Sequence, residues 1–110
     1  MPKIEYFYSE RSKGRPHWQE VYIALKEKGI TIHIEPKSCD YSVVLGGCFV
    51  NPIPLQGKKI LAVNTQEWQA AKWEFMFRPI LEEYYDKMIN VTGCTPEETL
   101  ELIKKTCVDS

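Results

Sequence analysis

The most informative segment of the chain reads Asp40-Tyr-Ser-Val-Val-Leu-Gly-Gly-Cys-Phe-Val-Asn-Pro52. Its short apolar, β-branched run is typical of a buried strand, and the glycine pair that follows predicts a loop in which the backbone approaches its neighbours closely. In open α/β sheets, ligands bind in the crevice at the carboxyl ends of the strands. The segment therefore predicts where a site would lie, although it does not name a reaction.

Strand and helix signals alternate on both sides of this segment. Strands are expected at 3–8, 30–34, 41–45 and 59–63, and a helix is expected from Pro16 to Gly29, where apolar residues recur at helical spacing. Strand, helix and strand in this order predict a parallel, right-handed βαβ unit. The fold class expected for residues 1–110 is a single α/β domain, three-layered and Rossmann-like, with a mainly parallel four-stranded sheet and helices on both faces.

The link between the second and third strands is short. Roughly five extended residues reach about 17 Å, which barely spans a strand. The third strand is therefore either antiparallel to the second or reached by a taut crossover without a helix. The crossover is favoured, because residues 41–45 show no polar alternation and a strand buried on both faces is typical of a parallel sheet.

Helical signals dominate the rest of the chain. Asn64 can cap a helix, with Glu67 completing a capping box. Pro79 should kink or break that helix. A second helical stretch is expected over 80–88, ending by Gly93. Thr95-Pro-Glu-Glu98 is another capping box, with proline at the first position, and predicts the start of the last helix.

Aromatic residues crowd the helix expected after Asn64 and occupy more than one of its faces. Trp68, Ala71 and Phe75 form one stripe, and Trp73 and Phe77 share a separate face at i, i+4 spacing. A second apolar face predicts a protein partner, a dimer contact or the packing of the following helix across it. Trp73 and Phe77 are therefore the expected interface residues.

The bulk composition excludes several classes of protein. The 110 residues carry a formal net charge of -1, so no overall field attracts nucleic acid or anionic lipid, and neither is expected as a partner. The apolar runs are too short to cross a membrane, and the N-terminus lacks the core of a signal peptide. A cytoplasmic location is expected.

The four cysteines are Cys39, Cys48, Cys94 and Cys107, and none of them forms a C-x-x-C pair. The two histidines lie far from them in sequence, so no metal site and no other cofactor is expected. Reduced thiols are favoured over disulfides, because the core does not need disulfides for stability and no secretion signal is present.

Candidate ligand-binding residues follow the predicted strands. The glycine pair 46–47 either lets backbone N–H groups approach a phosphate or a sugar, or supplies a turn with positive φ. The loop 9–15 takes the place of a phosphate loop in βαβ folds, and its cations either hold an anion or face solvent. His17 is a general base, a hydrogen-bond donor or an ordinary surface histidine. The expected ligand-binding residues are Ser9, Arg11, Gly14, His17, Gly46, Gly47, Asn51 and Asn64.

Three segments resemble the N-terminal, acceptor-side half of two-domain B-type glycosyltransferases and related phage-encoded Rossmann-like proteins. These are the opening strand with residues 9–17, the 40–51 segment and residues 59–64, and the segments 79–86 and 92–98 are similar as well. In such enzymes the N-terminal half holds the acceptor and the C-terminal half holds the sugar nucleotide. The resemblance therefore implies a binding role, without glycosyl transfer by this region alone.

Two functions are compatible with these features. The first is a small binding domain that takes an anionic or sugar-nucleotide-like ligand, or a protein partner such as a second copy of itself, as a viral accessory protein would. The second is a glycosyltransferase-like enzyme or subunit that uses the crevice at the strand carboxyl ends, with His17 as base. No Ser-His-Asp set or pair of catalytic carboxylates stands out in the sequence, so no catalytic residue is assigned.

Overall fold

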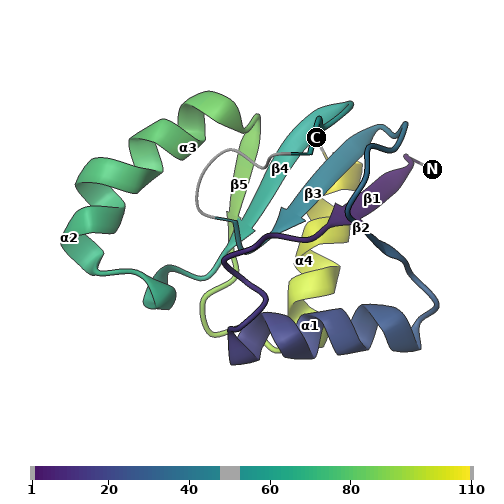
Figure 1. Cartoon of the computed structure of the whole chain (residues 1–110), viewed down its shortest axis with the longest axis horizontal. Helices are drawn as coiled ribbons and strands as arrows, with labels where there is room; N and C mark the ends of the chain where they lie inside the picture. Colours follow the sequence, from purple (N-terminus) through teal and green to yellow (C-terminus); the bar gives the residue numbers. More distant parts are fainter. Residues whose placement is uncertain (1, 48–52, 110) are drawn as a thin grey trace.

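The computed structural model describes residues 2–47 and 53–109, which contain a five-stranded parallel sheet with helices on both faces (Figure 1). The strand order is β2-β1-β3-β4-β5, and every neighbouring pair is parallel. This is one of the two common orders of doubly wound α/β folds. The predicted α/β, Rossmann-like class is confirmed, with five strands in place of four. The strands are β1 (Ile4–Phe7), β2 (Ile32–His33), β3 (Tyr41–Leu45), β4 (Lys58–Val63) and β5 (Lys87–Asn90).

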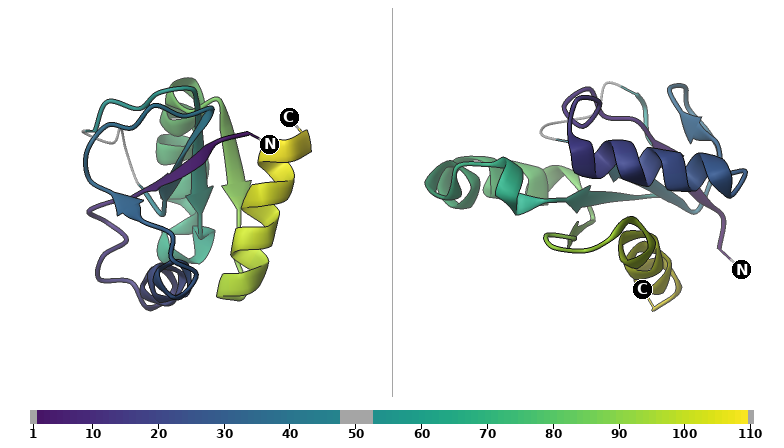
Figure 2. Two further views of the ribbon diagram at one scale, coloured as in Figure 1. Left: turned by 90° about the vertical axis from the view of Figure 1, so that its right-hand side faces the viewer. Right: turned by 90° about the horizontal axis from the view of Figure 1, so that it is seen from below.

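The helices form two groups. The first contains α1 (Pro16–Glu27) and α4 (Pro96–Asp109), which lie side by side (Figure 2). The second is a continuous helical segment made of α2 (Ala70–Lys72), the π-helix η2 (Trp73–Phe77) and α3 (Arg78–Tyr84), preceded by a 3₁₀ turn, η1 (Thr65–Glu67). Within the described residues, no helix is long and apolar enough to cross a membrane.

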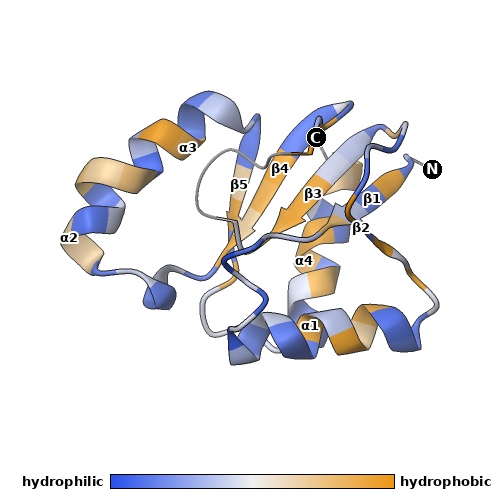
Figure 3. Cartoon of the chain, viewed as in Figure 1, coloured by the Kyte–Doolittle hydropathy of each residue, from blue (hydrophilic) through white to orange (hydrophobic). Residues whose placement is uncertain are grey.

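Each face of the sheet has its own core, because side chains alternate between the faces along a strand. In β3, Val43 packs in the cluster beneath α1 and α4, whereas Val44 packs in the cluster beneath η2 and α3. All five residues of β3 are buried, as expected for a central parallel strand. The apolar residues of β3 and β4 gather toward their carboxyl ends (Figure 3). The sheet is therefore most apolar next to the edge at which the sequence predicts a site.

The taut crossover into the third strand is confirmed. β3 pairs with β1 in parallel register, Ile4 opposite Tyr41, and β2 pairs with the other side of β1. The chain therefore passes over β1 between β2 and β3 without a helix. A backbone bond from the Asp40 N–H to the Lys3 carbonyl, 2.9 Å long, fixes the arrival of this link beside β1.

The expected helix over 80–88 is wrong in its second half. Helix α3 ends at Tyr84, and residues 87–90 form β5, which pairs with β4 through Leu61–Met88 and Ala62–Ile89. Gly93, at φ 80°, belongs to the turn between β5 and α4 and not to a helix end. Apolar residues at 81, 84, 85 and 88 match a helical period, and this local pattern predicts a helix. Residues 87–90 form a strand because they pair with β4, and a local pattern holds no information about that distant partner.

Pro79 does not break the helix. The backbone stays in the right-handed helical region at Lys72, Trp73, Phe77 and Arg78, and the chain passes through the π turn directly before the proline. A proline lacks the N–H that would bond to the carbonyl four residues earlier, and a π turn accommodates one extra residue by bonding i to i+5. The irregularity expected from Pro79 is therefore a change of helical register.

The capping box at the start of α4 is formed as predicted. The Thr95 Oγ1 accepts from the Glu98 N–H at 3.1 Å, and the Glu98 Oε1 accepts from the Thr95 N–H at 3.0 Å. Hydrogen bonding of the Glu98 carboxylate, first to the Thr95 backbone N–H and then to the Thr95 side chain, lowers the pKa of the Glu98 carboxyl. Helix N-terminal N–H groups have no partner within the helix, so the box satisfies two groups that would otherwise need water.

Replacing Thr95 by alanine should lower the free energy of unfolding by about 1 kcal/mol, the usual cost of losing a side-chain cap. Urea denaturation at neutral pH measures this loss. Thr31→Ala, at an exposed position outside a helix start, is the matched control and should change stability by much less. Equal effects of the two substitutions would show that the cap does not contribute.

Candidate functional site

The site expected from topology lies at the carboxyl ends of β1 and β3. From β1 the chain leads to β2 on one side, and from β3 it leads to β4 on the other, so these neighbours form the switch point of the sheet. The loops that follow β1, β3 and β4 meet here. Ser9 Oγ lies 3.4 Å from the position that a Cβ on Gly47 would take, and Ser9, Gly47 and Asn64 are all buried.

The glycine pair is used for packing within the chain. Gly46 has φ 74°, and a Cβ there would lie 2.5 Å from Trp18 Nε1 and 2.8 Å from Ser12 Cβ. Its N–H already donates to the Ala62 carbonyl at 2.8 Å. Of the two alternatives left open by the sequence, this geometry corresponds to the turn with positive φ. The close approach expected for a ligand is made by the Trp18 indole.

The loop after β1 is a folded turn. The Ser9 carbonyl accepts from both the N–H and the Oγ of Ser12, at 3.2 and 2.9 Å. Ser12 Oγ also bonds to the Tyr22 hydroxyl of α1. Gly14 is exposed, with no other heavy atom near the place of its missing Cβ. The loop therefore holds Ser9 in the interior and presents Gly14 to solvent.

Glu67 of η1 contacts both α1 and the loop after β1. The sequence analysis does not identify it as a site residue. Asn64 Oδ1 caps η1 by accepting from the Gln66 N–H at 3.1 Å, but the expected return bond from Glu67 is replaced by a longer-range contact. Glu67 Oε1 accepts from Trp18 Nε1 at 2.8 Å, and Oε2 lies 3.9 Å from Arg15 Nε. The Glu67 side chain is 12% exposed, so its carboxylate is a partly desolvated charge at the switch point.

Arg11 is the cation of this loop that lacks a carboxylate partner within the described residues. Lys13 pairs with Glu10 at 3.1 Å, and Arg15 pairs with Glu67. The Arg11 guanidinium instead lies 4.0 Å from the centre of the Trp68 ring, and its Nη2 donates to the Glu67 carbonyl at 2.9 Å. Its Nε is buried and has no hydrogen-bond partner among the described residues. A buried donor of this kind is costly to leave unsatisfied.

His17 lies in the first turn of α1, next to this group. Its ring meets the Trp18 ring edge-on, with 4.7 Å between the centroids. Burial lowers the pKa of His17, against the opposing effect of the Glu67 and Glu20 carboxylates. Its Nε2 is buried and has no hydrogen-bond partner within the described part of the chain. A neutral imidazole with an unused nitrogen can accept a proton or a hydrogen bond.

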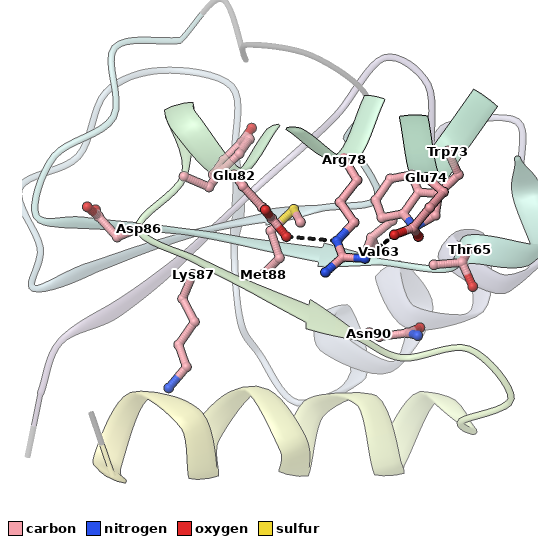
Figure 4. A pocket seen from close by; sticks show the side chains of 11 residues that line it. Val63, Thr65, Trp73, Glu74, Arg78, Glu82, Asp86, Lys87, Met88 and Asn90 are labelled. Carbon is pink, nitrogen blue, oxygen red and sulfur yellow. Dashed lines mark hydrogen bonds and ion pairs between the residues drawn. The ribbon is translucent and has the colours of Figure 1, made fainter. Parts of the chain in front are cut away.

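A separate cavity of about 580 Å³ lies between the helical segment and β5 (Figure 4). Arg78 points into it, with Nη1 2.6 Å from Glu74 Oε1 and Nε 2.8 Å from Glu82 Oε1. The expected ligand-binding residues that the structure describes are absent from its lining. The sequence missed this cavity because one wall is β5, which was expected to be helical. The lining residues are Val63, Thr65, Trp73, Glu74, Arg78, Glu82, Tyr85, Asp86, Lys87, Met88 and Asn90.

The apolar faces of the helical segment differ from the sequence analysis at Ala71, Phe75, Trp73 and Phe77, whereas Trp68 packs inward with Trp73 and Phe77. Trp73 is buried in the core cluster of η2 and α3, and Phe77 packs against Trp68 with 4.7 Å between ring centroids. Phe75, expected in the inner stripe, is 80% exposed, and Ala71 is exposed as well. The face of Trp73 and Phe77 therefore packs on this chain's own sheet.

Two of the sequence predictions, Asn51 and the thiol of Cys48, lie outside the described residues. Cys39, Cys94 and Cys107 form no disulfide within the described residues. In residues 2–47 and 53–109, no three His, Cys, Asp or Glu side chains gather as a metal site would require. Comparison of the chain with protein-family models, with curated proteins and with solved structures finds no match.

Proposed function

We propose that this protein binds a small phosphate-bearing ligand, a nucleotide or sugar nucleotide, at the carboxyl ends of β1 and β3. The observation that carries the proposal is Arg11, a cation without a carboxylate partner in the described residues, whose buried Nε lacks an acceptor at the topological switch point. A guanidinium binds phosphate oxygens through two parallel N–H donors, which would satisfy this nitrogen. The Trp68 ring beneath Arg11 holds its plane in place.

The surrounding groups support the same ligand class. Arg15 and Trp18 already share the Glu67 carboxylate, so that charge is compensated and does not oppose an anion next to Arg11. His17 adds a second buried nitrogen without a partner in the described residues. The resemblance to the acceptor-side half of B-type glycosyltransferases supports binding of a sugar acceptor, and the phosphate-bearing ligand rests on Arg11.

A second candidate function is glycosyl transfer with His17 as the general base, as one component of a larger enzyme. Burial lowers the pKa of His17, so the imidazole is neutral at neutral pH and Nε2 is able to take the proton of an attacking hydroxyl. In this version the acceptor hydroxyl bonds to His17 while Arg11 holds the phosphate of the leaving group. Donor hydrolysis by the protein is the measurable sign of this activity.

Ligand binding should raise the melting temperature of the native protein. We expect a stabilisation of about 2.7 kcal/mol when a ligand is present at one hundred times its Kd. Thermal unfolding with inorganic phosphate, uridine diphosphate and uridine diphosphate glucose measures this shift. Arg11→Ala should remove the shift, whereas Lys13→Ala, which removes an equal charge from the same loop, should retain it.

The three probes separate the outcomes. A shift with phosphate alone indicates a simple anion site, and a shift only with the nucleotides indicates that the base or sugar is also recognised. No shift with any probe, or an equal shift in Arg11→Ala, would contradict the proposed ligand. For the enzymatic version, His17→Ala should slow release of uridine diphosphate by about a hundredfold at saturating donor.

A further inference from the structure

The helical segment 70–84 and its C-cap residue carry an inner row of side chains that holds the segment on the sheet. Trp73, Leu81 and Tyr85 are buried and Phe77 is half-buried, at a spacing of four residues. In a regular α-helix such a row would drift by about 40° per step, because four residues exceed one turn. The π turn over 73–77 takes up the extra residue and reduces the drift. The inner row therefore stays against the sheet, and a definite opposite face points away from it.

The opposite face consists of exposed apolar side chains. Phe75 is 80% exposed, Met76 53% and Ile80 49%, and Ala71 and Pro79 are exposed between them. They form two adjacent rows at the same four-residue spacing, one of 71, 75 and 79 and one of 76 and 80. Single exposed apolar residues are ordinary, but a contiguous apolar patch on one helix marks an interaction surface.

Opposite charges stand at the two ends of this outer face. Lys72 precedes the row of Met76 and Ile80, and Glu83 follows the row of Phe75 and Pro79. Both charges are exposed, and neither forms an ion pair within the described residues. The other charges of the segment lie toward the cavity, where Glu74 and Glu82 bond to Arg78 (Figure 4). The outer face is thus apolar in the middle, cationic at its N-terminal end and anionic at its C-terminal end.

We propose that this outer face binds the same face of a second copy of the chain, with the two helices antiparallel across a two-fold axis. In that arrangement Phe75 lies against Pro79 of the second copy and Met76 against its Ile80, and Lys72 faces its Glu83 diagonally, across the two rows. The midpoints of all three pairs fall at residues 77 to 78, so one axis makes them together. A two-fold interface must be self-complementary in this way, each residue of a pair meeting the other twice.

The interface is a modest one. A single helix face buries less than the roughly 1,600 Å² of a standard protein–protein interface, so we expect a micromolar or weaker dimer. The chain should therefore change from monomer to dimer over an accessible range of protein concentration. Sedimentation equilibrium on the full chain measures the dissociation constant.

Ile80→Glu should raise the dimer dissociation constant at least about tenfold, because it buries a charge at the centre of the face. Ile34→Glu is the matched control, since Ile34 is 67% exposed and lies outside the helical segment. Both positions are exposed, so neither change should unfold the protein, and circular dichroism verifies this. A protein that stays monomeric at millimolar concentration, or a dimer equally sensitive to both substitutions, would overturn the proposal.

Charge exchange tests the antiparallel register. Lys72→Glu places like charges opposite each other twice and should weaken the dimer by about threefold to tenfold. The double variant Lys72→Glu/Glu83→Lys restores opposite charges and should regain the original dissociation constant. A dimer that is weakened by the single change and not restored by the double change contradicts this register. Arg11 and the switch point play no part in this test, so the proposed ligand site stands or falls separately.

Discussion

Gly46→Ala should lower the free energy of unfolding by about 2 to 5 kcal/mol, because two costs add at this position. The backbone has φ 74°, which an L side chain rarely adopts, and the new Cβ would lie 2.5 Å from Trp18 Nε1. Trp18 is fully buried and its indole bonds to Glu67, so it cannot move aside easily. Urea denaturation of the two proteins measures the loss.

Two other glycines separate the two costs. Gly29 has φ 75° with nothing within 4 Å of its missing Cβ, so Gly29→Ala measures the backbone cost alone, about 1 to 2 kcal/mol. Gly14 has neither a positive φ nor a neighbour, and Gly14→Ala should be close to neutral. If Gly46→Ala costs no more than Gly29→Ala, the packing of Trp18 on the glycine pair is not tight.

A double-mutant cycle identifies the partner in the clash. Trp18→Phe removes the indole nitrogen nearest to the missing Cβ, so Gly46→Ala should cost less in that background than in the wild-type chain. If the coupling is found, the main role of Gly46 in the 40–52 segment is to let the backbone pack against Trp18, and this role is structural. The glycines end a buried strand beneath Trp18, and the proposed ligand site uses the side chains of Arg11 and His17 near them.

The elements that could be predicted are those with a complete local signal. Helix α4 has a capping box and a periodic apolar face, and β3 is an apolar run closed by a glycine with positive φ. The missed strand β5 has no such signal, since its Met88 also continues a helical spacing. Its identity depends on pairing with β4, which is distant in sequence and invisible to a reading of local period.

The candidate site shows the same division between local and long-range information. Arg11 and His17 were expected from their place after β1, and the fold brings both into the neighbourhood of Glu67. The spacing of Glu67 from Asn64 predicts a local role in a capping box, whereas its carboxylate bonds to Trp18 instead. Because the local pattern already accounted for Glu67, nothing in the sequence indicated that its partner would be the distant Trp18. The aromatic stripe of Trp68, Ala71 and Phe75 fails for a related reason, since the helix begins only at Ala70 and Trp68 lies in the preceding turn.

Raising the pH from about 8 to about 12 should lower the free energy of unfolding by about 3 to 5 kcal/mol through Tyr6 and Cys107. Both side chains are buried in the cluster beneath α1 and α4. Burial, with a smaller contribution from the Cys107 thiolate, raises the pKa of Tyr6 from 10.0 to about 12. Burial raises the pKa of Cys107 from 9.0 to about 11, against the opposing charge of Lys87.

The sign follows from which state releases its proton first. The unfolded chain ionises Cys107 from about pH 9 and Tyr6 from about pH 10, whereas the folded chain keeps Cys107 neutral up to about pH 11 and Tyr6 up to about pH 12, so rising pH stabilises the unfolded state. Stability is fully present below the unfolded pKa values and is lost as the pH passes through the folded ones. Each group contributes about 2.7 kcal/mol if it acts alone, since one pKa unit corresponds to about 1.36 kcal/mol.

Tyr6→Phe tests the tyrosine share directly, because a phenyl ring cannot ionise and fits nearly the same space. Urea denaturation of both proteins across this pH range should show that the variant retains about half of the stability that the wild type loses. The phenolate absorbance of the folded wild type, compared with that of the variant, should show one tyrosine that titrates near pH 12. Parallel pH dependences in the two proteins would mean that the Tyr6 hydroxyl is hydrated in the native state. The core beneath α1 would then be more open to solvent at β1 than the 3% exposure of Tyr6 indicates.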